Sequence, residues 1–202
     1  AVTSASGIIA IGHNALSAED TQGGNGGAIA IGCNALCSQN ATGGMNVAIG
    51  LDAGNNLVDA SENVFLGWSA GSGLTGGTNV AIGAKTLAST SSGVSNVAIG
   101  YDALRYNTGS HNVSVGGQAG GASASSAGDG SYNTFLGRLS GGAITNGDYN
   151  LFLGYQTGDA VTTGCCNVAI GHGADVASAT GNCQLAIGIA ANNWITGDSS
   201  FN

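Results

Sequence analysis

Few residues in this chain could support catalysis, and their spacing limits the chemistry open to them. Among the acidic residues, Asp159 and Asp175 are the one pair whose positions could bring two carboxylates together. Cleavage of a polysaccharide needs such a pair, held roughly 5 to 9.5 Å apart, to act as acid and base or nucleophile. We keep this pair as an alternative hypothesis. The leading expectation is that the protein has no catalytic residue and is not an enzyme.

Metal and cofactor chemistry has even less support in the sequence. His13, Cys33 and Cys37 could come near one another, but their spacing does not form a zinc signature. The chain also lacks a phosphate-binding loop, a dinucleotide fingerprint and an ordered Ser, His and Asp set in the right context. We therefore expect no metal and no cofactor.

One pentapeptide recurs along the whole chain and fixes the place of every candidate residue. Close copies of Asn46-Val47-Ala48-Ile49-Gly50 return at a spacing near 17 residues, and we use the last glycine of each copy as a marker. A fixed period of this size is typical of a stack in which each repeat packs only against its neighbours. The markers are Gly12, Gly32, Gly50, Gly67, Gly83, Gly100, Gly116, Gly137, Gly154, Gly171 and Gly188.

Each copy alternates large and small residues, which predicts a short β-strand. Val, Ile or Leu stands three residues and one residue before almost every marker, and the residue between them is Ala, Ser or Phe. The predicted fold is an all-β parallel β-roll or β-solenoid of about eleven repeats. At ~4.8 Å per strand, it would form a rod on the order of 50 Å long. The longer steps before Gly32 and Gly137 are expected to place their extra residues in corners.

Two further positions in the repeat carry structural information. Where Phe stands in the strand, glycine stands four residues after the marker, as in Phe65 with Gly71, Phe135 with Gly141, and Phe152 with Gly158. In a close-packed interior a large residue at one position requires a small one at the other, so both positions should face the same compartment. Gly54 and Gly120 break this rule, because they are glycines in repeats whose strand has no Phe. Asn stands four residues before most markers. Its amides could hydrogen-bond from repeat to repeat, or form a polar stripe that meets a ligand.

Cysteines and aromatic residues also occupy fixed places in the repeat. Cys166 and Cys183 each precede a marker by five residues, so they should stack on adjacent repeats at a spacing that suits a disulfide. Two unpaired thiols are the alternative. Trp68, Tyr101 and Tyr155 each follow a marker directly, at an expected corner, where a ring could stack on a sugar. Packing between repeats or between chains is the alternative for these rings.

Composition excludes several classes of protein. The chain has 202 residues, 38 glycines and no proline, and only 7% of its residues are charged, which argues against helices and against collagen. A net charge of −8, with Lys85, Arg105 and Arg138 as the only fixed cations, makes nucleic acid and anionic membranes unlikely partners. No apolar run approaches the ~18 residues that span a bilayer. The absence of an initiator methionine is expected of a fragment or a processed product.

We expect one elongated repeat domain over residues 7–192, preceded by an incoming segment at 1–6 and followed by an exit segment or junction at 193–202. Trp194 is expected to plug the end of the stack or to join the next section. Two large residues per strand are a thin core for so much ordered backbone. Self-association is therefore expected, with the strip of small strand residues buried around a shared axis.

The repeats resemble the head repeats of YadA-type trimeric autotransporter adhesins and the related repeats of bacteriophage tail fibres, in particular those of cyanophages. The resemblance rests on the NVAIG-type pentapeptides followed by Ala and Leu, as in Asn96 to Leu104, and covers residues 7–192. It implies a parallel β-roll that forms a homotrimer, displayed outside a cell or on a virion. The period is longer than in the adhesin heads, and Phe interrupts the strip of small residues.

The sequence thus predicts a structural and receptor-binding segment of a tail fibre or a surface adhesin. Its expected partners are copies of itself, a host cell-surface receptor or glycan, and adjoining domains of the same fibre. Two other hypotheses stay open: a tailspike-like enzyme that degrades polysaccharide through Asp159 and Asp175, and a non-viral extracellular filament or ice-binding solenoid.

Overall fold

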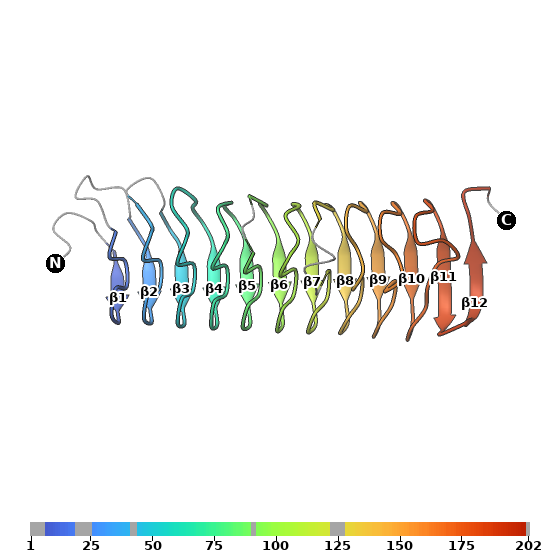
Figure 1. The fold of residues 1–202 in the computed structure, drawn as a ribbon, viewed down its shortest axis with the longest axis horizontal. Helices are drawn as coiled ribbons and strands as arrows, with labels where there is room; N and C mark the ends of the chain where they lie inside the picture. The colour runs from blue at the N-terminus through green and yellow to red at the C-terminus, as the bar shows by residue number, and fades with distance from the viewer. Residues whose placement is uncertain (1–6, 19–25, 41–43, 90–91, 122–127, 201–202) are drawn as a thin grey trace.

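Each copy of the pentapeptide forms one short strand, and the strands stack into a long parallel β-solenoid (Figure 1). The computed structural model describes residues 7–18, 26–40, 44–89, 92–121 and 128–200. The strands are β1 (Ile9–Ile11), β2 (Ile29–Ile31), β3 (Val47–Ile49), β4 (Val64–Leu66), β5 (Val80–Ile82), β6 (Val97–Ile99), β7 (Val113–Val115), β8 (Thr134–Leu136), β9 (Leu151–Leu153), β10 (Val168–Ile170), β11 (Leu185–Ile189) and β12 (Asn192–Gly197). The predicted all-β parallel solenoid, with a coil near 17 residues, is confirmed.

The strands pair in chain order, and the pairing register follows the marker glycines. Strands β1 to β11 are parallel, so that Ala48 of β3 lies opposite Phe65 of β4. The two long repeats keep the same register, since Ile9 pairs with Ile29 and Val113 with Thr134. The extra residues of these repeats therefore do not change the pairing register of the strands. Most of the extra residues, 19–25 and 122–127, lie outside the described part of the chain. Within that part there is no helix long and apolar enough to cross a membrane.

The last strand reverses direction. Residues Asn192–Gly197, expected as the start of an exit segment, form β12, which runs antiparallel to β11 with an irregularity between Ile187 and Gly188. Trp194 lies on this strand with 70% of its surface exposed, so the expectation that it plugs the end of the stack is wrong. Its side chain does not fill the interior, because β12 extends the sheet beyond β11 as its edge strand.

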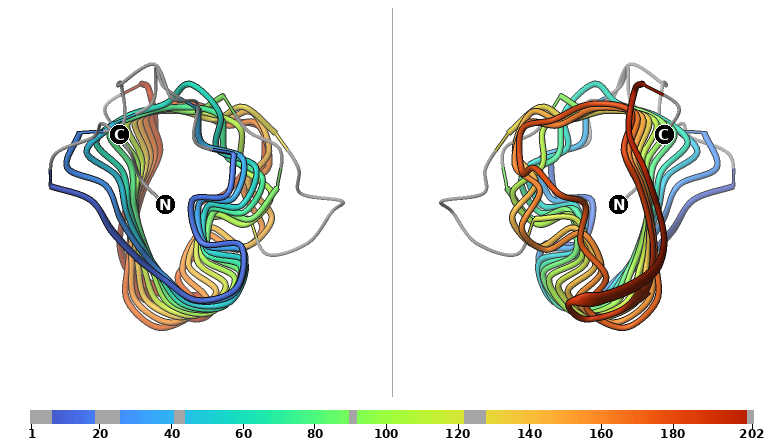
Figure 2. Two further views of the ribbon diagram at one scale, coloured as in Figure 1. Left: turned by 90° about the vertical axis from the view of Figure 1, so that its left-hand side faces the viewer. Right: turned by 90° about the vertical axis from the view of Figure 1, so that its right-hand side faces the viewer.

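The strands bury their small residues inside the coil and turn their large residues outward. We call the residues two places before each marker the inner column; from Ala30 to Ala186 this column is buried, whereas Ala10 of β1 is exposed. The large residues on either side of it, the outer columns, are half-buried or exposed. The expectation that the small residues face a shared axis between chains is therefore wrong. Seen along the axis, the strands form one long side of each coil, and the return path folds toward them (Figure 2).

Side chains of the return path explain why the inner column is small. Leu36, Leu57, Leu87 and Leu104 are fully buried and fill the interior opposite the strands. This leaves room for only a methyl group at the strand, because interiors are close-packed. The sheet therefore buries alanine, and its branched residues must point to the other face.

Phenylalanine enters the inner column only where glycine makes room. A Cβ added to Gly71 would lie 2.5 Å from the ring of Phe65, and Gly141 and Gly158 have the same relation to Phe135 and Phe152. The predicted shared compartment is confirmed. The two exceptions are also explained, because a Cβ on Gly54 would lie 2.8 Å from Phe65, and one on Gly120 would lie 2.7 Å from Phe135. Each of these glycines makes room for the ring on the following coil.

The marker glycines are required by both conformation and space. At Gly50 the φ angle is +140°, and a Cβ would lie 2.5 Å from the carbonyl oxygen of Gly67 on the next coil. The same close approach recurs from Gly32 to Gly50 and from Gly137 to Gly154. A side chain here would collide with backbone that cannot move without breaking the stack.

The asparagines four places before the markers form a buried column, which we call the amide column. The side-chain Oδ1 of Asn96 accepts hydrogen bonds from the backbone N–H of Asn112 at 2.9 Å and from its Nδ2 at 3.2 Å. Asn96 Nδ2 donates to the carbonyl oxygen of Gly109 at 3.0 Å. The same bonds run from Asn46 to Gln184. The predicted amide stack is confirmed, and its burial leaves no stripe open to a ligand.

Candidate functional site

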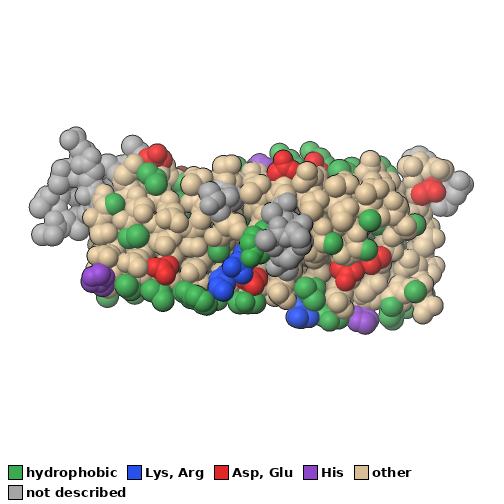
Figure 3. All heavy atoms as spheres, in the orientation of Figure 1, with side chains coloured by type: hydrophobic (Ala, Val, Ile, Leu, Met, Phe, Trp, Pro, Cys, Tyr) green, Lys and Arg blue, Asp and Glu red, His purple; other side chains and the backbone are tan. Residues whose placement is uncertain are grey.

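The corner that follows each strand presents a row of exposed side chains. We call the residues directly after the markers the corner column: His13, Cys33, Leu51, Trp68, Ala84, Tyr101, Gly117, Arg138, Tyr155, His172 and Ile189. Backbone hydrogen bonds hold successive corners together, as from Lys85 N–H to the Trp68 carbonyl oxygen at 2.8 Å. In Figure 3, hydrophobic side chains line the lower edge of the rod, where the chain turns after each strand in Figure 1.

The three aromatic residues predicted at corners all lie there and are exposed. Trp68 exposes 49% of its surface, Tyr101 52% and Tyr155 40%. Their surroundings differ. Tyr155 is stacked on His172 of the next coil, with ring centroids 5.3 Å apart, and the Arg138 guanidinium of the previous coil lies 5.8 Å from its ring centroid. Neighbours from both adjacent coils therefore contact the ring of Tyr155, which leaves little of it for a ligand.

Trp68 and Tyr101 have smaller neighbours in the corner column. Ala84 lies on the coil between them, and Gly117 follows Tyr101 on the next coil. Within the described residues, no ring contact is found for either side chain. The group beside Trp68 is instead the ammonium of Lys85, 4.8 Å from the centroid of the Trp68 ring. We refer to Trp68 and Tyr101 as the ring pair.

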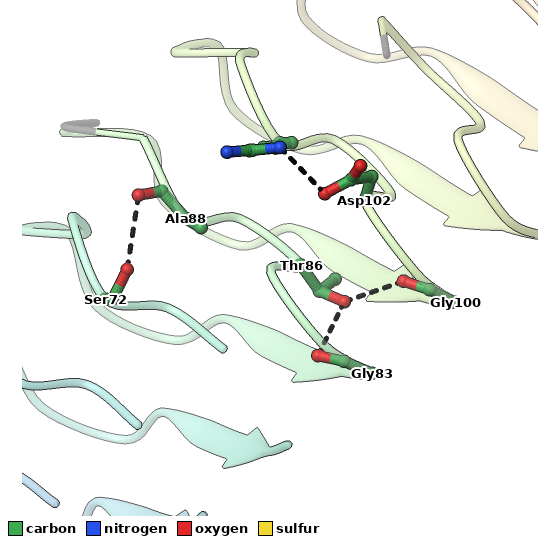
Figure 4. Close-up of polar contacts among 7 residues, drawn as sticks. Ser72, Gly83, Thr86, Ala88, Gly100 and Asp102 are labelled. Atoms are coloured by element: carbon green, nitrogen blue, oxygen red, sulfur yellow. Dashed lines mark hydrogen bonds and ion pairs between the residues drawn. The ribbon is translucent and has the colours of Figure 1, made fainter. Parts of the chain in front are cut away.

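Lys85 and Arg105 lie near the ring pair on adjacent coils, whereas the third cation, Arg138, lies further along the corner column beside Tyr155. Arg105 Nη1 forms an ion pair with Asp102 Oδ1 at 3.2 Å, and its guanidinium lies 4.9 Å from the Tyr106 ring centroid. Figure 4 shows this ion pair beside Thr86, whose hydroxyl donates to the carbonyl oxygens of Gly83 and Gly100. Thr86 thus fixes the backbone of both corners from within.

Asp102 is almost fully buried, and its charge is balanced locally. Its carboxylate pairs with Arg105 and also interacts with the Tyr101 hydroxyl. The hydrogen bond to Asp102 and the negative charge of Asp102 raise the pKa of Tyr101. Lys85 differs from Arg105 in this respect, because the ion pair with Asp102 is the only salt bridge found in the described part of the chain. The Lys85 ammonium is therefore the more available of the two cations.

A second exposed row stands five places before the markers, at the corner that precedes each strand. His111 stacks on Tyr132 and Tyr132 on Tyr149, with centroids 4.8 and 4.9 Å apart and nearly parallel rings. The sequence analysis did not single out this stack, although all three residues share one place in the repeat. That shared place is the signal that could have found it.

Cys166 and Cys183 continue the same row on the next two coils. Backbone bonding brings them into line, since Cys183 N–H donates to the Cys165 carbonyl oxygen at 3.0 Å. Both are free thiols in the structure. Desolvation and the neighbouring Cys183 raise the pKa of the Cys166 thiol. The predicted adjacency is confirmed, and the disulfide between them stays a prediction.

Asp159 and Asp175 also lie on adjacent coils and interact directly. Desolvation, followed by the hydrogen bond and charge of Asp159, raises the pKa of Asp175 to about 6, although the Ala160 N–H opposes this by donating to Asp175 Oδ1 at 3.3 Å. Two interacting carboxyl groups of this kind favour a state in which one of them keeps its proton, because two like charges on adjacent coils repel each other.

The candidate metal ligands do not converge. Cys33 Sγ lies 4.0 Å from His13 Nδ1, but the Cys37 thiol is directed to the carbonyl oxygen of Asn55 at 3.3 Å. Among the described residues, no group of three His, Cys, Asp or Glu side chains could hold a metal ion.

In comparisons with known proteins, no family model, curated protein or solved structure matches this chain. The class that the structure itself defines is the parallel β-solenoid, and this class accommodates many functions. The likeness to adhesin heads and tail fibres stays a resemblance in the repeat residues.

Proposed function

We propose that this chain is a structural and receptor-binding segment of an extracellular fibre, either a bacteriophage tail fibre or a trimeric surface adhesin. In this role it acts as a stiff spacer, and copies of it associate as a homotrimer. The observation that carries the proposal is the outer face of the sheet. A solenoid that buries its small residues and exposes its branched ones has a surface that a partner is needed to cover.

The outer columns form an apolar strip along the rod. Every member except Thr134 is Val, Ile or Leu, and none is charged. Ile9, Ile49, Val113 and Leu153 are among those with more than a third of their surface exposed. At ~4.8 Å per strand and roughly 10 Å of width, the strip covers about 500 Å² per copy. The largest apolar patch on a typical monomer covers about 300–600 Å² and is often functional, so a continuous strip of this size is a candidate interaction surface.

Copies of the same chain are the occupants that fit this strip. Its apolar character runs from β1 to β11, so an equally long and equally apolar surface is needed to cover it. A second strip supplies that surface, and a three-fold arrangement places each copy in two interfaces. The strip is shared between these two interfaces, so it supplies only part of the ~800 Å² per partner that stable interfaces bury, and flanking residues have to supply the rest. The number three follows the resemblance to trimeric adhesins.

Continuous hydrogen bonding suits the mechanical part of the role. Ladders run through the strands, through the corners and through the amide column, as in the bond from Asn34 N–H to the His13 carbonyl oxygen at 2.9 Å. Bending or stretching such a rod strains many bonds at once. Repeated corners also present similar side chains at regular intervals, which favours multivalent attachment.

The proposal is tested by the mass of the purified protein in solution. Sedimentation equilibrium should give three times the 19.4 kDa mass of one chain. Val113→Asp places a charge in the outer column, and Val58→Asp places the same charge at a similarly exposed valine of the return path. We expect the first variant to dissociate to monomers and the second to remain a trimer, both with unchanged circular dichroism. A monomeric wild type, or equal behaviour of the two variants, would contradict the proposal.

The other two hypotheses predict different outcomes. A polysaccharide-degrading enzyme that works through Asp159 and Asp175 would lose cleavage of its substrate in Asp159→Asn. A non-viral filament would grow beyond a closed trimer at high concentration, and an ice binder would show thermal hysteresis.

A further inference from the structure

We propose that the ring pair, Trp68 and Tyr101, binds a carboxylated sugar whose pyranose ring lies between the two side chains at the level of Ala84. Lys85 supplies the positive charge that meets the carboxylate. This inference deepens the receptor-binding part of the proposed function, because it assigns a site and a chemical class of ligand.

The spacing of the ring pair is the first argument. Rings of the corner column stack when they stand on adjacent coils, as Tyr155 and His172 do at 5.3 Å with planes 10° apart. Trp68 and Tyr101 stand two coils apart, or roughly 10 Å by strand spacing. A ring placed midway would lie about 5 Å from each, within the usual range for stacked rings. The corner column has only the small Ala84 at that level, and the Lys85 ammonium lies 4.8 Å from the centroid of the Trp68 ring.

Contrast with the other aromatic rows supports this choice. In the row of His111, Tyr132 and Tyr149, each ring packs against its neighbour, so Tyr132 has a ring on both sides. Tyr155 has Arg138 and His172 as neighbours. Trp68 and Tyr101 are the exposed pair in which the intervening residue is small, which is the arrangement that admits a ligand ring.

The charge at this corner selects the class of ligand. The molecule carries a net charge of −8, yet Lys85 and Arg105 stand on adjacent coils here. The Lys85 ammonium lies over the Trp68 ring and must leave it when a ligand enters. That contact is weak at a site open to water, so a ligand can displace it. A neutral ligand would not replace it, whereas a carboxylate would.

A uronic acid satisfies both requirements in one residue. The C–H groups on the face of its pyranose ring can pack on an aromatic ring, while its carboxylate projects from the ring edge. Arg105 is less suited to bind the carboxylate because it already neutralises the buried Asp102 at 3.2 Å. Lys85 therefore binds the carboxylate of the ligand, and Arg105 stabilises the corner through its ion pair with Asp102.

The test uses the fluorescence of Trp68. The chain has two tryptophans, so Trp194→Phe leaves Trp68 as the single emitter. Titration of this variant with an oligogalacturonate should give a saturable change in emission, and a neutral malto-oligosaccharide of the same length should give none. Raising the salt concentration should weaken the binding, because Lys85 is only half-buried and salt therefore screens its charge.

Three further substitutions in the same background locate the site. Ala84→Tyr completes the stack with a ring of the chain itself and should abolish binding. Lys85→Gln should weaken binding at least tenfold. Tyr155→Ala is the matched control, because it removes an aromatic ring from the same column and should leave the affinity unchanged. Circular dichroism confirms that each variant retains the fold.

The result is read together with the solution mass of the same samples. Absence of a saturable signal, equal binding of the neutral sugar, or full binding by Ala84→Tyr would overturn this inference. A trimer that fails to bind oligogalacturonate defeats the sugar site and leaves the assembly proposal standing. A monomer that binds it defeats the assembly proposal alone.

Discussion

The inner and outer columns of the sheet differ in what limits the size of their side chains. On the inside, each residue shares its space with a return-path side chain of its own coil and of the preceding coil, so Ala48 and Phe65 can be neighbours only because Gly54 and Gly71 are present. On the outside, Val, Ile and Leu follow one another with no such exchange. The difference teaches that packing within the chain limits side-chain volume on the inner face and does not limit it on the outer face.

The largest expected effect comes from emptying the inner column. Phe65→Ala removes a fully buried ring and should lower the free energy of unfolding by about 3–5 kcal/mol, because the surrounding coils cannot collapse into the space. Urea unfolding measures this. Adding Gly71→Leu recreates the combination of Ala81 and Leu87 found at β5 and should recover part of the loss. If the double variant were no more stable than Phe65→Ala, the shared compartment would be disproved.

Breaking the amide column should have the next largest effect. Asn96→Ala removes the acceptor of the Asn112 N–H and a donor to Gly109, and leaves both groups buried without these partners. Each unsatisfied buried group costs about 1–3 kcal/mol, so the total loss for the two groups should be roughly 2–6 kcal/mol. Asn96→Gln is the control, because it keeps a side-chain amide, and the amide of Gln184 at the equivalent place donates to Asn167 Oδ1 at 3.4 Å. Equal losses in both variants would indicate that packing, rather than the amide, is responsible.

A smaller effect on the free energy of unfolding is expected to depend on pH. The folded-state pKa of Asp175 is raised from 3.8 to about 6, so its protonated form favours the folded state. The stabilisation is complete below about pH 4 and is lost as the pH rises through about 6. Asp175→Asn should therefore unfold with less dependence on pH in this window, and be more stable than the wild type at pH 7 by about 1 kcal/mol, allowing for solvent screening.

Thermal unfolding at pH 4 and pH 7 measures this difference. Glu62→Gln removes an exposed acid elsewhere and should retain the wild-type dependence. A wild-type protein that gains stability between these two values through Asp175 would contradict the assigned sign.

The smallest effect is expected on the outer face. Ile99→Thr should change the unfolding free energy of the dissociated chain by less than about 1 kcal/mol, because Ile99 already contacts water. Its neighbour on the same strand is the matched control, since Ala98→Leu overpacks the interior and should cost about 1–3 kcal/mol. Similar losses for the two variants, measured by urea unfolding at low protein concentration, would remove the distinction between the columns.

Much of the fold could be read from the sequence because every coil repeats the same environment. The marker glycines predicted the register, and the pairs of Phe and Gly predicted a shared compartment before any coordinates. The sequence did not predict which face of the strand lies inside the coil. The alternation of large and small residues separates the two faces but does not say which is buried, and large apolar residues are usually the buried ones. Here the side chains of Leu36 and its equivalents on the return path fill the interior, so only small strand residues fit beside them.

The candidate site was predicted in part. The place of Trp68, Tyr101 and Tyr155 at corners followed from the repeat, but their different surroundings depend on residues one coil away. His172 stacks on Tyr155 because it occupies the same place in the following coil. Comparing each residue with its equivalents in adjacent coils, rather than with its neighbours in sequence, would have separated Tyr155 from the ring pair.

The amide column has one further consequence. From Asn63 to Asn167, each asparagine donates its backbone N–H to the amide of the preceding coil and accepts the equivalent bond from the following coil, so a coil carrying its own asparagine can be inserted or deleted without creating a new kind of junction. Rod length can therefore change in steps of one coil, about 4.8 Å at a time, by duplication or loss of a gene segment encoding a single repeat. The reach of such a rod is a quantity that selection can tune separately from its surface.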